Sequence, residues 1–132
     1  MQGLKTARSS FKSQETMDRF EAQVRAKGMH VFCRIDQAAV AREVGLELGP
    51  AELLIFGNPR AGTLLMQLNP TSAIDLPLKA LVWTDASHDT WLSYNEPEWI
   101  ARRHDLSGEA DATVGAMAAA LAALCKAATE AA

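Results

Sequence analysis

The sequence predicts an α+β domain with two layers, in which helices and strands alternate along the chain. Two short apolar segments, Leu53–Phe56 and Leu78–Thr84, have the length and composition of strands, and the segment between them has helical spacing. A third strand, Thr90–Tyr94, follows the second after the polar run Asp85–Asp89, which is the pattern of a β-hairpin with a loop of about five residues. Antiparallel pairing is therefore expected at one edge of the sheet at least.

The chain is expected to begin with an edge strand followed by a helix. Residues Gly3–Phe11 alternate loosely between apolar and polar types, and the charged residues among them suit the edge of a sheet. Ser13 is placed to cap a helix in which Met17, Phe20 and Val24 share one face.

A second strand and a short helix follow. In Met29–Ile35 apolar and polar residues alternate, so three side chains are expected on one face of a strand: Val31, Cys33 and Ile35. The helix between the two strands makes this unit a candidate crossover connection. Asp36 is expected to cap the Ala-rich helix Gln37–Val44, which Gly45 ends.

The segment between the two apolar strands carries two Asn-Pro pairs. Leu53–Phe56 is predicted to be buried on both faces, and Asn58 with Pro59 has the pattern of a helix N-cap followed by the first helical residue. Four apolar residues then share one helix face, which is expected to contact the sheet: Ala61, Leu64, Leu65 and Leu68. Asn69 and Pro70 repeat the pattern and predict a short second turn that reaches Asp75.

Two further helices are expected after the hairpin. The first is capped by Asn95 or Glu96, starts near Pro97 and ends with three basic residues: Arg102, Arg103 and His104. The second, Asp111–Thr129, is the longest and has a narrow apolar seam made by Val114, Met117, Leu121, Leu124 and Ala128. Two alternatives remain open for this seam, namely packing on the sheet of its own domain and packing against a second copy of the chain.

Composition and charge exclude several classes of function. The net charge is −3 and the basic residues are scattered without interleaved aromatic residues, so nucleic-acid binding is not expected. Cys33 and Cys125 form no CxxC pair, and no histidine spacing predicts a metal site. No secretory signal occurs near the N-terminus, and the uncharged stretch Ala112–Cys125 is shorter than a membrane span. A cytoplasmic protein without a membrane or nucleic-acid partner is expected.

Candidate functional residues are polar groups at the ends of apolar elements. The backbone N–H groups at Asn58–Arg60, together with the Arg60 guanidinium, can receive an anion, although helix capping alone also explains these residues. Asn69 is placed at the next turn. His104 can act as a proton carrier if Asp75 orients its ring, although a histidine at the end of a helix is commonly a surface cation.

Three aromatic side chains lie on or beside the predicted hairpin: Trp83, Trp91 and Tyr94. An aromatic hairpin face can line an apolar ligand pocket, belong to the core or form a homodimer surface. Among the three, Tyr94 is the candidate ligand-binding residue. No sequence motif identifies a catalytic mechanism or a cofactor.

The chain resembles the DUF302 family of small bacterial and archaeal proteins without an assigned function. The resemblance covers about Gly3 to Leu106 and is carried by four short pieces: Phe56-Gly57-Asn58-Pro59, Asp75-Leu76-Pro77-Leu78, Ser93-Tyr94-Asn95 and Arg103-His104. It implies helices packed on one face of a mainly antiparallel sheet, an assembly that is often dimeric, and no assigned reaction. The family commonly has His after the residue equivalent to Asp36, where this chain has Gln37, so a metal or acid–base role for that pair is disfavoured.

Three hypotheses about function follow from these features. Residues 1–109 form a DUF302-like domain, extended by a C-terminal helical segment at 110–132, and we expect a homodimer that binds a small anion or metabolite through Asn58, Arg60, Asn69 and Tyr94. An alternative is an enzyme in which His104 works with Asp75 or Asp36. A third possibility is an interaction protein without a ligand, for which the Ala-rich terminal helix is the argument.

Overall fold

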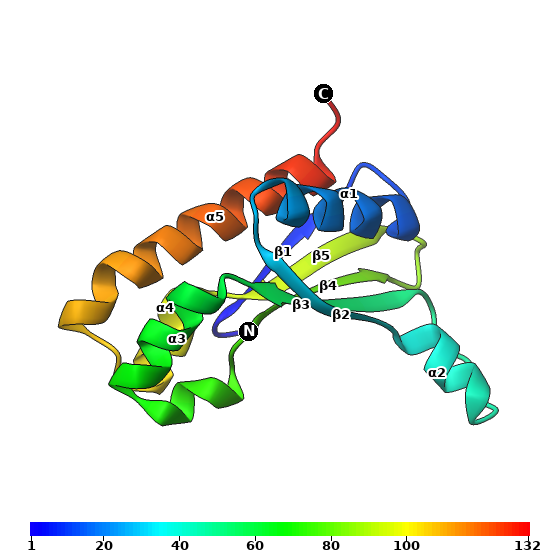
Figure 1. Ribbon diagram of the computed structural model, residues 1–132. Helices are drawn as coiled ribbons and strands as arrows, with labels where there is room; N and C mark the ends of the chain where they lie inside the picture. The colour runs from blue at the N-terminus through cyan, green and yellow to red at the C-terminus, as the bar shows by residue number, and fades with distance from the viewer.

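The computed structural model describes residues 1–132 and contains one five-stranded, fully antiparallel sheet (Figure 1). In spatial order the strands are β1 (Leu4–Arg8), β5 (Thr90–Asn95), β4 (Leu78–Thr84), β3 (Ala51–Gly57) and β2 (His30–Asp36). The α-helices are α1 (Ser13–Ala26), α2 (Gln37–Glu43), α3 (Pro59–Leu68), α4 (Pro97–Arg103) and α5 (Asp111–Thr129), with two 3₁₀ helices, η1 (Pro70–Ile74) and η2 (Gly108–Ala110).

Two helices, α1 and α5, lie side by side over one face of the sheet and form its second layer (Figure 1). The core between the layers is apolar, and its two largest fully buried side chains, Phe20 of α1 and Phe56 of β3, meet edge to face with ring centroids 5.2 Å apart. The predicted α+β two-layer fold is confirmed, as is the edge position of β1. Helix α1 is a crossover that connects the two edge strands, β1 and β2.

The sheet is covered on one face only, which corrects the prediction that the strand around Leu53–Phe56 is buried on both faces. Leu54 and Phe56 are fully buried beneath the helices, whereas Leu53 and Ile55 on the opposite face remain partly exposed. The uncovered face also carries Trp83 of β4, because side chains alternate along each strand and Val82 points to the core. We call this uncovered surface the open face.

A bulge in β2 corrects the predicted grouping of its apolar side chains. Val31 pairs with Phe56 and points to the helix layer, but the register shifts before Cys33, which pairs with Ile55 on the open face. An inserted residue changes the face to which every following side chain points. Cys33 and Ile35 therefore lie on the open face, opposite to Val31.

Two local predictions about helices are wrong. Helix α1 begins at Ser13 but its N-cap residue is Lys12, which makes no side-chain capping bond. In α3 the predicted sheet-facing stripe is only partly buried, because Leu64 and Leu68 are each almost half exposed whereas Leu65 is buried. Helix α3 packs at the end of the sheet beside α5, so it buries a narrower side than a helix lying flat on a sheet.

Helix α5 packs within its own domain. Its predicted seam is buried, with Leu121 and Leu124 inside the core, and α1 and α4 are its main helical neighbours. This observation decides between the two packing alternatives for the seam in favour of the domain's own core. Together with η2, the helical run Gly108–Thr129 spans 22 residues and is long and apolar enough to cross a membrane by length and composition. This run is longer than the uncharged stretch Ala112–Cys125, which by itself is shorter than a membrane span.

Candidate functional site

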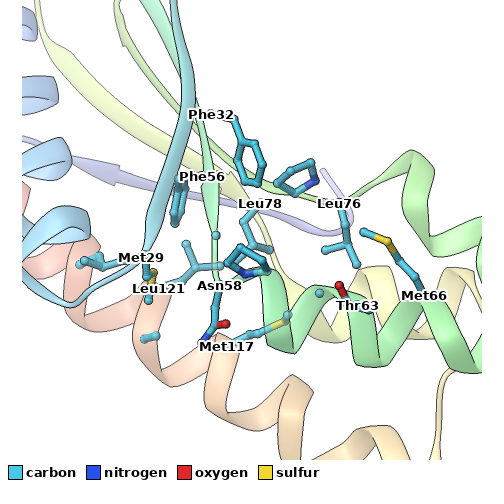
Figure 2. A pocket seen from close by; sticks show the side chains of 16 residues that line it. Met29, Phe32, Phe56, Asn58, Thr63, Met66, Leu76, Leu78, Met117 and Leu121 are labelled. Atoms are coloured by element: carbon cyan, nitrogen blue, oxygen red, sulfur yellow. The ribbon is translucent and has the colours of Figure 1, made fainter.

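An apolar cavity of about 220 Å³ lies where α3, α5 and the ends of β3 and β4 meet (Figure 2). Sixteen residues line it: Met29, Phe32, Phe56, Gly57, Asn58, Pro59, Gly62, Thr63, Met66, Leu76, Pro77, Leu78, Met117, Ala120, Leu121 and Leu124. None of them is charged. The cavity exceeds the roughly 150 Å³ at which an apolar engineered cavity binds benzene. It therefore has room for a small apolar body.

The cavity forms because α3 starts immediately after β3. Asn58 ends the strand and its Oδ1 accepts from the backbone N–H groups of Arg60 and Ala61 at 3.0 and 3.4 Å, so the helix begins at Pro59 as predicted. One turn later Gly62 is buried, and a Cβ placed there would meet nothing closer than the Met66 methyl group at 3.9 Å. The missing side chain of Gly62 leaves room in the cavity wall.

Methionine side chains supply much of the lining. Met29 precedes β2, Met66 lies on α3 and Met117 lies on α5, so three separate elements each contribute one thioether. Methionine is unbranched and polarizable, and it adapts its shape to different apolar partners. The polar side chains in the wall are Asn58 and Thr63, whose functional groups are visible among the labelled side chains of Figure 2. The chemistry of the wall suits a ligand that is largely apolar.

A shallow groove between α3 and α5 adjoins the cavity. Its volume is about 460 Å³, and the two hollows meet at Met29, Asn58, Met117 and Ala120, which line both of them. The remaining groove wall is formed by Arg60, Ala61 and Leu64 of α3 and by Ala112, Thr113 and Ala116 of α5. The half-exposed position of Leu64 is explained by this groove.

His104 and Asp75, the predicted catalytic pair, are brought together by the fold. His104 Nε2 lies 2.5 Å from Asp75 Oδ2, and His104 Nδ1 lies 2.9 Å from Thr71 Oγ1. Arg103 Nη1 donates to both carboxylate oxygens of Asp75 at 3.0 Å, and Asn69 Nδ2 donates to the His104 carbonyl at 2.6 Å. Both ring nitrogens of His104 are thus engaged within the protein.

This polar cluster fastens η1 to the end of α4. His104 is only 6% exposed, and neither His104 nor Asp75 lines the cavity. Leu76 and Pro77, however, follow Asp75 directly and form part of the cavity wall. The arrangement offers no free ring nitrogen of His104 to a substrate. The polar cluster instead supports the segment that forms one wall of the cavity.

The other predicted site residues do not form a single cluster. Asn58 lines the cavity, Arg60 lines the groove and Asn69 belongs to the polar cluster. Tyr94 is buried in β5 beneath the helix layer, where burial raises the pKa of its hydroxyl group. The four residues that were expected to bind one ligand, Asn58, Arg60, Asn69 and Tyr94, therefore do not all line one hollow.

Asp36 is distant from His104. Its Oδ1 accepts from the Ala39 N–H at 3.0 Å and caps α2. Helices α2 and α4 lie at opposite ends of the sheet (Figure 1). The alternative that paired His104 with Asp36 is thereby corrected. No group of three or more His, Cys, Asp or Glu side chains converges to hold a metal ion.

The apolar side chains that make the cavity were missed by the sequence predictions. Met29 was predicted only as the first residue of an alternating strand, Met66 lies outside the predicted helix stripe, and Met117 was assigned only to a packing seam. One usable signal is Gly62, because a glycine inside an otherwise helical pattern reduces helix stability and points to a packing or functional reason.

Comparison with known protein families gives one match. Residues 5–124 match the family described as domain of unknown function DUF302, so the matched region includes the sheet, the cavity and most of α5. A crystal structure of an uncharacterized conserved protein DUF302 from Bacillus stearothermophilus superimposes with a TM-score of 0.85 and covers 97% of this chain and 99% of its own. The two sequences are 19% identical, so this likeness establishes the fold.

Curated relatives from Brucella match part of their length. The fluoride-specific ion channel FluC 1 of Brucella suis biovar 1 (strain 1330) is 47% identical over 115 residues, which are 87% of this chain and 45% of the relative. FluC 2 of Brucella melitensis biotype 1 (strain ATCC 23456 / CCUG 17765 / NCTC 10094 / 16M) has the same identity over 43% of its length. The chain thus spans less than half the length of these relatives.

Proposed function

This chain belongs to the DUF302 family, and from that premise we propose that it is a small-molecule binding domain whose ligand occupies the apolar cavity between α3 and α5. The observation that carries the proposal is the cavity wall, which combines three methionines and several larger apolar side chains with no charged group. Binding sites for small molecules are typically concave and apolar, with a few polar groups that orient the ligand. Asn58 and Thr63 occupy that orienting position.

A fluorescent apolar probe tests the proposal. The neutral dye N-phenyl-1-naphthylamine is titrated into the protein, and saturable enhancement of its emission with one site per chain is expected. Gly62→Leu fills the cavity and should abolish this enhancement, whereas Gly115→Leu places the same side chain on the exposed side of α5 and should preserve it. Circular dichroism verifies that both variants fold. No saturable enhancement with the native protein, or equal enhancement with Gly62→Leu, would contradict the proposal.

We also propose that the domain works as a homodimer formed through its open face. The segment that we call the α2 arm, residues 37–48, extends beyond the sheet on the side opposite α1 and α5 (Figure 1). Its larger apolar side chains are about half exposed or more in the single chain: Val40, Val44, Leu46 and Leu48 are 46%, 70%, 65% and 53% exposed. The open face also carries large apolar side chains, among them Leu53, Ile55 and Trp83, so each chain has two surfaces that a second copy can cover.

The size of these surfaces supports an exchange of arms between two copies. At about 3.3 Å per residue and about 4.8 Å between strands, the open face measures roughly 20 Å by 20 Å. That face, about 400 Å², is about half of the roughly 800 Å² that each partner buries in a stable interface, and the arm adds a further apolar surface. In the proposed dimer the open face and the α2 arm of one copy contact the same two surfaces of the other copy, which is the arrangement of a two-fold dimer.

Sedimentation velocity tests this assembly. We expect a dimer at micromolar concentration and a monomer for Leu46→Asp, in the arm. The matched control is Ile74→Asp, since Ile74 is 72% exposed on η1 and lies outside the arm. A native protein that stays monomeric at 100-fold higher concentration, or a dimer that survives Leu46→Asp, would contradict the arrangement.

A second candidate function follows from the matched relatives. We propose that the chain acts beside a fluoride channel, since the similar segment forms 45% of the Brucella suis channel protein. Fluoride efflux is measured from liposomes that contain this relative, the relative without the matched segment, or a hybrid with the present chain in its place. The efflux rate of the relative without the matched segment is expected to differ from that of the intact relative. The hybrid is expected to regain the rate of the intact relative. Equal rates for all three would remove this candidate.

A further inference from the structure

Arg60 is the one charged residue among the ten that line the groove between α3 and α5. It follows Pro59 in the first turn of α3, it is exposed, and it forms no salt bridge with any carboxylate of the chain. Arg34 and Arg103, by contrast, are both paired with acidic side chains, whereas Arg19, Arg42 and Arg102 also form no salt bridge but lie outside the groove. The groove therefore contains one unpaired cation beside an otherwise uncharged and largely apolar surface.

The groove and the cavity together provide a continuous and largely apolar path, and this cation lies in the groove part of it. They meet at Asn58 and Met117, and the flexible Met117 side chain stands at the junction. The cavity itself has no charged lining residue. A molecule that extends from the cavity into the groove would thus place its apolar part among the methionines and its other end near Arg60.

We propose that the ligand is an amphipathic carboxylate with an unbranched hydrocarbon chain, whose tail fills the cavity and whose carboxylate pairs with Arg60. The inference rests on the cavity being a ligand site, as proposed above. The unbranched chain is favoured because adaptable methionine side chains surround the inner part of the path. The carboxylate is favoured because arginine recognises that group through parallel N–H donors.

The test compares straight-chain alkanoates from hexanoate to dodecanoate with the matching 1-alkanols by isothermal titration calorimetry. Affinity for both series should rise with length, by at most about fourfold for each buried methylene. The carboxylates should bind more tightly than the alcohols, and added salt should reduce this advantage because it screens an exposed ion pair.

Arg60→Gln isolates the contribution of the cation. Alkanoate affinity should fall about three- to fivefold in this variant, the range of an exposed ion pair, while alkanol affinity stays unchanged. Arg102→Gln, an exposed arginine of α4 outside the groove, serves as the control and should leave both series unaffected.

The possible failures have different meanings. Equal binding of alkanols and alkanoates, with no effect of Arg60→Gln, would overturn the assignment of an amphipathic carboxylate and leave the cavity as an apolar site. Binding that disappears in Gly62→Leu supports the placement of the tail, whereas binding that persists there would overturn it. If neither series binds and the neutral fluorescent probe does not bind either, the proposed function fails together with this inference.

Discussion

His104 and Asp75 form a hydrogen-bonded pair across 29 residues of sequence, with His104 Nε2 2.5 Å from Asp75 Oδ2. The pair lies where η1 meets the end of α4, and both side chains are largely buried. Because Asp75 is followed by two residues of the cavity wall, the pair determines where that wall stands. The contact gives the histidine a structural role at the border of the candidate site.

Replacing Asp75 by Asn is expected to reduce the free energy of unfolding by roughly 2–3 kcal/mol, since the buried His104 ring and the Arg103 guanidinium would lose a charged acceptor. Urea denaturation measures this loss. Asp105→Asn is the matched control, because Asp105 is exposed, has a φ of 53° and makes no side-chain hydrogen bond, and asparagine also tolerates that backbone conformation. Equal stability of Asp75→Asn and the native protein would contradict the assigned role.

Most of the fold could be predicted from local patterns. The hairpin strands, the Asp36 and Asn58 caps and the boundaries of α5 follow from signals within a few residues, and the structure confirms them. The burial of Leu53 could not be predicted, because a short apolar run does not reveal how many layers cover its strand. The Val31–Cys33 bulge was likewise absent from the alternating pattern, since it depends on pairing with β3.

The candidate site was only partly predictable. Asn58 and the His104–Asp75 pair were identified because helix-capping residues and charged residues can be recognised from the sequence alone. The cavity was not, because it arises where elements from distant parts of the chain leave space between Met29, Gly62 and Met117. Tyr94 was misplaced for a related reason, since the face to which a strand residue points depends on sheet register and layer order.

Leu121→Ala tests how the cavity is built. Leu121 is 1% exposed and lines the cavity, so its truncation should reduce the free energy of unfolding by about 2–5 kcal/mol and enlarge the space available to the neutral dye. Leu92→Ala, in β5, removes an equally buried side chain outside the cavity and should destabilise comparably without tighter dye binding. Urea denaturation and dye titration are compared for both variants. Identical dye affinities of the two variants would contradict the assignment of Leu121 to the wall of the binding space.

The two thiols should react at very different rates. Cys33 is exposed on the open face, whereas Cys125 is buried in α5, where burial raises the pKa of its thiol and reduces the reactive thiolate. Ellman's reagent is expected to modify one thiol in the native monomer and the second only after unfolding, and Cys33→Ser should abolish the fast phase. In a dimer formed through the open face the fast phase should slow as protein concentration rises. A concentration-independent rate across the dimerisation range would exclude Cys33 from the interface.

The ion-pair cluster around Arg34 should make stability depend on acid pH. Hydrogen bonds from Arg25 and Arg34 lower the pKa of the Glu21 carboxyl below its usual value. A lowered folded pKa means that this stabilisation is fully present above the unfolded pKa of about 4.3 and is lost as the pH falls through the folded pKa. The free energy of unfolding should therefore decline below about pH 4.

Arg34→Gln should destabilise by about 2 kcal/mol at pH 7, because Arg34 also binds Glu52 through two bonds of 2.9 Å, and the difference from the native protein should shrink near pH 3. Arg8→Gln is the control, as its pair with Asp89 is mostly exposed and should contribute less than about 1 kcal/mol. Urea denaturation at a series of pH values measures both. A difference for Arg34→Gln that stays constant from pH 7 to pH 3 would contradict this explanation.

The most direct test of the ligand site is the methyl spectrum of the protein labelled with ¹³C at its methionine methyl groups. Met29, Met66 and Met117 line the cavity, whereas Met17 of α1 is buried in the core outside the cavity and Met1 is fully exposed. On titration with decanoate, the signals of the three cavity methionines should shift saturably while those of Met1 and Met17 stay in place. Unchanged signals for the three cavity methionines, or equal shifts for all five, would contradict the assignment of this cavity as the binding site.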